Sequence, residues 1–168
     1  MREKMVADIQ RVPATENVAR LLSREWFVKD VLQHTAFRLA AGETYISVNR
    51  PVVDSYDADV FLFVSTHYSY IFGNDSKYYR RALMNVGQIN GIDVRVGEKE
   101  LSVEVQVEPR AARTKSHAGI FTRFQNHNIK RGAAVRLSTT EEVSADTILL
   151  EVREQLLMIA KVEELERK

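Results

Sequence analysis

The sequence predicts one α+β domain in which helices flank an antiparallel or mixed sheet. Three observations support this class: a strand-like alternation over 101–107, a helical apolar stripe after Ser144, and a length of 168 residues, which suits one domain. The composition, 45% hydrophobic and 28% charged, is close to the average for soluble proteins. We therefore expect residues 1–168 to form a single domain, with 1–12 as an extended lead-in.

Two elements are predicted before residue 50. Thr15 gives a helix start signal, and the apolar residues that follow it, Val18, Leu21 and Leu22, would form the buried face of a short helix. Residues 45–49 alternate large apolar and small polar side chains, which predicts a strand with one face turned inward.

The middle of the chain has less regular patterns. Residues 52–59 carry three aspartates and are expected to form a loop. The apolar run at 59–65 is short and rich in β-branched and aromatic residues, so a buried strand is favoured over a helix. After a turn at Gly73 two alternatives stay open, a helix over 76–83 or a strand over 82–89.

The C-terminal half gives the strongest patterns. From 101 to 107 apolar and polar residues alternate without exception, which predicts a half-exposed antiparallel strand. Further short strands are expected at 118–121 and 133–137. Ser144 or Asp146 can cap a long final amphipathic helix, and the acidic residues at 163–166 are expected to fray into water. The apolar stripe of this helix consists of Leu149, Val152, Leu156, Ile159 and Ala160.

The composition also restricts the classes of function. The 24 Lys and Arg residues nearly balance the 23 Asp and Glu residues, so the net charge does not indicate nucleic acid or a membrane as the partner. The absence of cysteine excludes thiolate catalysis, disulfides and cysteine-ligated metals. The N-terminal residues lack the apolar run of a signal peptide, and no apolar stretch approaches the ~20 residues that span a bilayer. We expect a cytoplasmic protein without membrane association.

Neither a metal nor a cofactor is predicted. The four histidines are His34, His67, His117 and His127. No pair of them has the HExxH or HxH spacing that places two imidazoles on one metal. Asp54, Asp57 and Asp59 could hold a hard cation, but the glycine and distal glutamate of a calcium loop are missing, so a solvated acidic loop is favoured. Glycine-rich phosphate loops are absent as well.

Ser116 and His117, close to Gly119, are the strongest candidates for a site. They stand at a predicted loop-to-strand junction, where a glycine allows close approach of the backbone to a ligand. A histidine there can act as an acid or base near neutral pH. The alternative is structural: Ser116 closes a turn and His117 hydrogen-bonds a backbone carbonyl. The two interpretations are equally favoured.

Basic residues concentrate around this segment. They are Arg110, Arg113, Lys115, Arg123, Lys130, Arg131 and Arg136. Interleaved with Phe121 and Phe124, they could bind phosphate or single-stranded nucleic acid by charge and stacking. The near-zero net charge favours a solvated loop balanced by acidic groups, so nucleic acid is not the favoured partner.

Several segments in order resemble a family of small uncharacterised bacterial proteins. They are AFRLAAGETYISVNR at 36–50, MNVGQI at 84–89, VEP at 107–109 and SHAGIF at 116–121, followed by the C-terminal helix. The family carries an AF-x-L-x-x-x-E-x-x-L-S-V-N segment and a later P-S-H-A-G-I segment. Arg50 stands where the family has tryptophan, and Lys115 where it has proline. The resemblance implies a single domain and brings no known activity.

The polar members of the two matching segments are Glu43, Ser47, Asn49, Ser116 and His117, and Arg50 is specific to this chain. If the strands at 45–49 and 118–121 are neighbours, these groups could converge at one end of the sheet. This hypothesis predicts a pocket in which Glu43, Asn49 and His117 reach one ligand, with Ser47 as a further ligand-binding candidate.

Two classes of function stay open. In the first, the protein is an interaction or accessory module for a protein partner, and the candidates for its apolar surface are Tyr68, Tyr70, Phe72, Tyr78 and Tyr79. In the second, it is a small enzyme or ligand-binding protein for a phosphorylated or nucleotide-like substrate. His117 would then be the acid or base, oriented by Glu43, while Arg50 and Arg113 or Arg123 neutralise the substrate. The first is slightly favoured, because the spacing yields no complete catalytic constellation.

Overall fold

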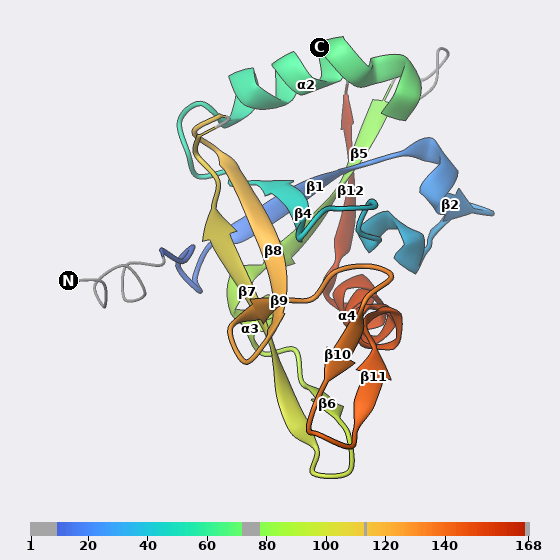
Figure 1. Ribbon diagram of the computed structural model, residues 1–168. Coiled ribbons are helices and arrows are strands. Elements are labelled where there is room, and N and C mark those ends of the chain that lie inside the picture. Colours follow the sequence, from blue (N-terminus) through green and yellow to red (C-terminus); the bar gives the residue numbers. More distant parts are fainter. Residues whose placement is uncertain (1–9, 72–77, 113, 167–168) are drawn as a thin grey trace.

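The computed structural model describes residues 10–71, 78–112 and 114–166, with side chains except at 67–71, 78–79 and 165–166 (Figure 1). The strands of the main sheet are β1 (Asn17–Leu22), β4 (Tyr45–Asn49), β5 (Tyr78–Asn85), β6 (Val94–Val96), β7 (Leu101–Pro109), β8 (His117–Phe124), β9 (His127–Asn128) and β12 (Lys161–Glu166). Two small sheets pair β2 (Phe27–Val28) with β3 (Val31–Leu32) and β10 (Ala134–Arg136) with β11 (Glu142–Ser144). The helices are α2 (Tyr56–Ile71), α3 (Val86–Asn90) and α4 (Ala145–Ile159), with the short 3-10 helices η1 (Arg24–Trp26) and η2 (His34–Phe37).

The main sheet is antiparallel throughout, and its strand order is β12-β5-β1-β4-β8-β7-β6, with β9 paired to β8. The sheet is curled, with α4 against one of its faces and α2 across the opposite face (Figure 1). β4 is the middle strand of this order, and the long β7–β8 pair lies between β4 and the edge strand β6. The α+β class, the single domain with flanking helices and the long C-terminal helix are as the sequence predicts.

One face of the sheet carries the main core. Val103, Val105 and Val107 of β7 are buried there, as the alternation predicts, and α4 covers this face with Val152 and Leu156. Complete burial of one such side chain contributes about 1.5–3 kcal/mol. Helix α4 begins where the Ser144 hydroxyl accepts a hydrogen bond from the N–H of Asp146 (3.2 Å). The strands predicted at 45–49, 118–121 and 133–137 correspond to β4, β8 and β10.

The opposite face is covered by α2 over β1 and β5 only. Val60 and Val64 of α2, four residues apart and hence on one side of the helix, pack with Tyr56 against Ala19 and Leu21. Over β4, β8 and β7 this face is filled by polar and aromatic side chains of the strands themselves. Four of the predicted site residues, Ser47, Asn49, His117 and Arg123, lie on these strands.

The helix predicted after Thr15 is wrong, because residues 17–22 form β1. Val18 and Leu22 of this strand face the main core, while Ala19 and Leu21 face α2. A strand buried on both faces loses the polar alternation that would identify it. The lead-in ends in contact with the core, since Val12 is buried and donates its N–H to the carbonyl of Val107 (2.9 Å).

Three further predictions are wrong. The apolar run at 59–65 is helical and lies within α2, and the expected loop at 52–59 ends where α2 begins at Tyr56. The acidic end at 163–166 does not fray but belongs to β12, which pairs with β5. There Glu163 forms an ion pair with Arg81 (2.9 Å), so the acidic residues have partners on the neighbouring strand. After Gly73 the structure shows a strand, β5, over Tyr78–Asn85 and then α3 over Val86–Asn90, so the alternative helix over 76–83 is wrong and only the first half of the alternative strand over 82–89 is confirmed.

Candidate functional site

Strands β4 and β8 are neighbours, as the site hypothesis requires. Asn49 lies opposite His117 and Ser47 opposite Gly119, so these side chains share one face. The amide of Asn49 also donates to the hydroxyl of Ser116 (2.8 Å). The structure thus brings Ser47, Asn49, Ser116 and His117 together at one end of the β4–β8 pair.

Glu43 is not part of this group. It lies in the turn that precedes β4, where its carboxylate accepts a hydrogen bond from the N–H of Ala40 (3.1 Å). Asn49 is at the far end of the same strand, and six residues of extended chain span about 20 Å. The pocket expected between Glu43, Asn49 and His117 is therefore not formed, because two of its members stand at opposite ends of β4.

Asp59 joins the group instead, from the first turn of α2. Its Oδ2 accepts hydrogen bonds from the N–H of Ser116 (3.0 Å), the hydroxyl of Ser116 (2.6 Å) and the hydroxyl of Ser55 (2.9 Å). Burial by itself would raise the pKa of Asp59, but these hydrogen bonds and the charge of Lys115 hold the pKa below its ordinary value. We call Ser55, Asp59, Ser116 and Asn49 the Asp59–Ser116 junction.

The junction ties the start of α2 to the start of β8. Ser116 is fully buried, and its hydroxyl donates to Asp59 while it accepts from Asn49. Sequence reasoning missed Asp59 as a partner of Ser116, because 57 positions separate them and Asp59 was one of three aspartates in an expected loop. The arrangement has the properties of a structural anchor: its polar groups are paired with one another.

His117 is buried, with 7% of its surface exposed. Its Nδ1 lies 3.3 Å from the carbonyl oxygen of Arg110, and its Nε2 lies 3.3 Å from the hydroxyl of Ser47. The ring also contacts Tyr45, at 5.9 Å between centroids. These contacts match the structural alternative, in which His117 bonds a backbone carbonyl, and the acid–base role remains an untested prediction.

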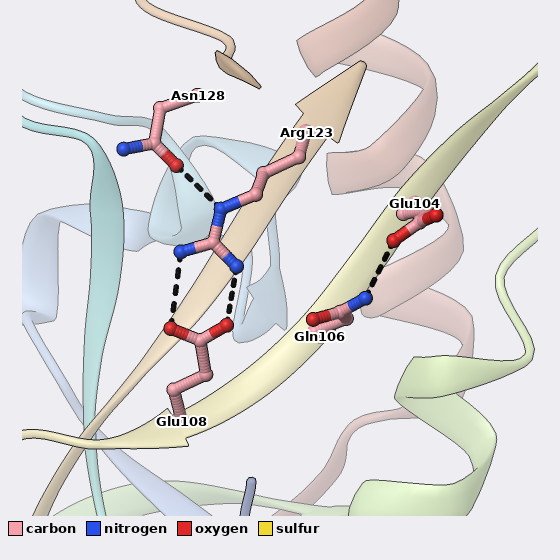
Figure 2. A network of polar contacts seen from close by, with 5 residues as sticks. All are labelled: Glu104, Gln106, Glu108, Arg123 and Asn128. Carbon is pink, nitrogen blue, oxygen red and sulfur yellow. Dashed lines mark hydrogen bonds and ion pairs between the residues drawn. The ribbon is translucent and has the colours of Figure 1, made fainter. Parts of the chain in front are cut away.

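The arginines expected to neutralise a substrate are engaged with carboxylates of the chain. Arg50 binds Glu16 through two hydrogen bonds (2.8 and 2.9 Å), and this contact raises the pKa of Arg50 despite burial, which lowers it. Arg123 binds both carboxylate oxygens of Glu108 and also Asn128, as Figure 2 shows. Arg113 lies outside the described residues.

The face around Arg123 is closed by stacked side chains. The guanidinium of Arg123 lies 4.5 Å from the ring of Phe121, and that of Arg110 lies 5.0 Å from the ring of Tyr45. Tyr45 lies over Gly119, where an added Cβ would come within 2.5 Å of the tyrosine ring. Phe121 is only 4% exposed, so its ring has no free surface on which a nucleobase could stack.

An exposed apolar surface is found on α2. Phe61 is 61% exposed, Leu62 59% and Phe63 42%. The tyrosines and Phe72 predicted for such a surface lie in the part of the chain whose side chains are outside the description. The sequence signal for the observed surface was the apolar run itself, which is too long to be buried by one side of a helix.

Neither a group of metal ligands nor a membrane-spanning helix is found in the part of the chain that the structure describes. In that part of the chain no three His, Asp or Glu side chains are grouped to hold a metal. None of the described helices is long and apolar enough to cross a membrane. Comparison of the chain with family models, with curated proteins and with solved structures finds no match.

Proposed function

We propose that this protein is an interaction module that binds a partner protein through the outer side of α2. The observation that supports the proposal is the exposure of Phe61 and Leu62, more than half of each side chain, on a helix whose inner side is already packed through Val60 and Val64. From 60 to 64 the helix is apolar on its outer side as well as its inner side, and a helical segment of this kind is normally buried. Contiguous exposed apolar side chains are typical of protein-binding surfaces.

The charges around this surface indicate the chemistry of the partner. Asp54 and Asp57 are exposed at the start of α2, and the segment from 51 to 66 contains no lysine or arginine. The partner we propose therefore has an apolar groove with a basic rim. A second copy of this chain would bring a second acidic rim and no complementary charge from this segment.

The proposal is tested with synthetic helical peptides that carry one leucine stripe and either lysine or glutamate beside it. We expect the lysine peptide to bind about 10-fold more tightly than the glutamate peptide in fluorescence anisotropy, because only the former matches Asp54 and Asp57. Leu62→Asp should abolish binding without loss of stability, since an exposed residue changes the free energy of unfolding by no more than about 0.5 kcal/mol.

The matched control is Met158→Asp, a residue that is 86% exposed on α4, the helix that lies apart from α2 in Figure 1. This variant should bind the lysine peptide as the wild type does. Equal affinity for the two peptides, or binding that survives Leu62→Asp, would contradict the proposal. Light scattering adds a second readout: a concentration-dependent dimer that Leu62→Asp abolishes would assign the surface to a second copy instead.

A further inference from the structure

A surface cleft of about 310 Å³ lies between η2 and α4, away from the α2 surface. His34 and Arg38 enter it from η2 and the residue after it, Arg131 from the loop before β10, and Asp146 and Arg153 from α4. The three arginines come from three separate segments of the chain. Their convergence cannot be read from the sequence, in which only Arg131 belongs to a basic cluster.

Two polar atoms of this cleft are buried without a partner. They are Nδ1 of His34 and Nε of Arg153, for which the described part of the chain provides no hydrogen bond. Buried polar groups are nearly always paired, with protein, water or ligand. Both nitrogens belong to side chains that line this one cleft, His34 from η2 and Arg153 from α4, and the N–H at Nε of Arg153 lacks an acceptor there.

The charge of the cleft indicates which acceptor fits. Three guanidinium groups face a single carboxylate, Asp146, which already accepts a hydrogen bond from the N–H of Gly132 (2.8 Å). Burial lowers the pKa of Arg153, and the positive charges of Arg38 and Arg131 lower it further. The negative charge of Asp146 raises this pKa, but the net shift is downward. Positive charges held together in this way are unfavourable until an anion joins them.

We propose that this cleft binds a small phosphate monoester. The excess of two positive charges matches a phosphate group, which carries about −1.5 to −2 at pH 7 and presents three acceptor oxygens. Guanidinium groups bind such oxygens through paired N–H donors. Leu39 and Leu149 line the same cleft and supply an apolar wall for the organic part of the ester. The volume lies at the lower end of the range for small-molecule sites.

Isothermal titration calorimetry tests the proposal with phenyl phosphate, inorganic phosphate and benzoate as ligands. We expect phenyl phosphate to bind most tightly and Arg153→Met to weaken it about 10- to 100-fold, the effect of losing a charged hydrogen bond. The matched control is Arg136→Met, which removes the same charge from an exposed side chain on β10. That variant should change the affinity little, because its charge is screened by solvent.

Loss of binding through misfolding is distinguished by thermal melting in phosphate-free buffer. Arg153→Met should melt no lower than the wild type, because it removes an unpaired buried nitrogen and a like-charge contact. Equal affinity for inorganic phosphate and phenyl phosphate would overturn the monoester in favour of free phosphate. Binding of benzoate as tight as that of phenyl phosphate, or no binding of any probe, would also overturn the proposal. So would a short single-stranded RNA that binds more tightly than phenyl phosphate and depends on Arg153.

Discussion

The Asp59–Ser116 junction and the arginine cleft are both polar regions, but they differ in how their hydrogen bonds are satisfied. In the junction, one oxygen of Asp59 accepts three hydrogen bonds, and the hydroxyl of Ser116 both donates and accepts. In the cleft, His34 and Arg153 each bury a nitrogen that has no partner among the described residues. Among the described residues, Asp59 and Ser116 are hydrogen-bonded within the chain, whereas these two nitrogens of the cleft are not.

This difference distinguishes polar groups that stabilise the fold from polar groups that we propose to bind a ligand. A hydrogen bond to an ionised group contributes about 1.5–3 kcal/mol to stability, whereas an unpaired buried donor costs about 1–3 kcal/mol. Substitutions should therefore have opposite signs in the two regions. Removal of a paired group destabilises the protein, and removal of a cleft arginine leaves it unchanged or more stable.

The largest effect is expected at Glu108 and Arg123, which form the least exposed ion pair among the described residues. Their side chains are 10% and 16% exposed, and the two guanidinium contacts of Figure 2 satisfy both carboxylate oxygens. Glu108→Leu should lower the free energy of unfolding by about 3–5 kcal/mol, because it leaves a buried charge unpaired. Urea denaturation measures this loss. The double variant Glu108→Leu, Arg123→Met should recover most of it, and a double variant no more stable than the single one would show that packing rather than charge explains the effect.

Asp59→Asn should have the next largest effect, about 2 kcal/mol at pH 7, because three donors lose a charged acceptor. The folded pKa of Asp59 lies below its ordinary value of 3.8, so the charged form is the one that the fold stabilises. Its contribution is present above about pH 4 and is lost as the pH falls through the folded pKa. The stabilities of wild type and Asp59→Asn, measured by urea denaturation from pH 7 to 2.5, should converge at the acidic end.

Asp57→Asn is the matched control for this pH series, since Asp57 is an exposed aspartate in the same turn of α2. It should change the free energy of unfolding by no more than about 0.5 kcal/mol, because the side chain of Asp57 is exposed. A difference between wild type and Asp59→Asn that stays constant down to pH 2.5 would mean that the carboxylate charge does not stabilise the junction.

A second contrast, between elements that bury one face and elements that bury both, explains which parts of the fold could be predicted from the sequence. Strands β4 and β7 and helix α4 each bury one face, so their apolar residues follow a period of two or of 3.6. Strand β1 buries both faces and shows no period. The apolar residues of α2 continue around the helix onto its exposed side, and the resulting run was interpreted as a strand.

The candidate site shows a similar division. The neighbourhood of Asn49, Ser116 and His117 followed from two predicted strands that proved to be paired. Asp59 could not be added, because its position depends on the helix that the sequence pattern misassigned. The cleft could not be predicted for another reason: Arg38, Arg131 and Arg153 line it because η2 and the loop before β10 both pack against α4, and no local sequence pattern encodes those contacts.

The smallest effect on stability is expected in the cleft, where a single arginine is removed. Arg38→Gln should raise the free energy of unfolding by no more than about 0.5 kcal/mol in phosphate-free buffer of low ionic strength, because the charge of Arg38 opposes that of Arg153. At about 1 M salt the gain should vanish, since the Debye length falls to about 3 Å. Arg95→Gln is the control, because Arg95 is paired with Asp93 (2.7 Å) and its loss should not stabilise the protein. If Arg38→Gln lowers the stability at low salt, the arginines are satisfied within the fold, and the cleft belongs with the junction as part of the scaffold.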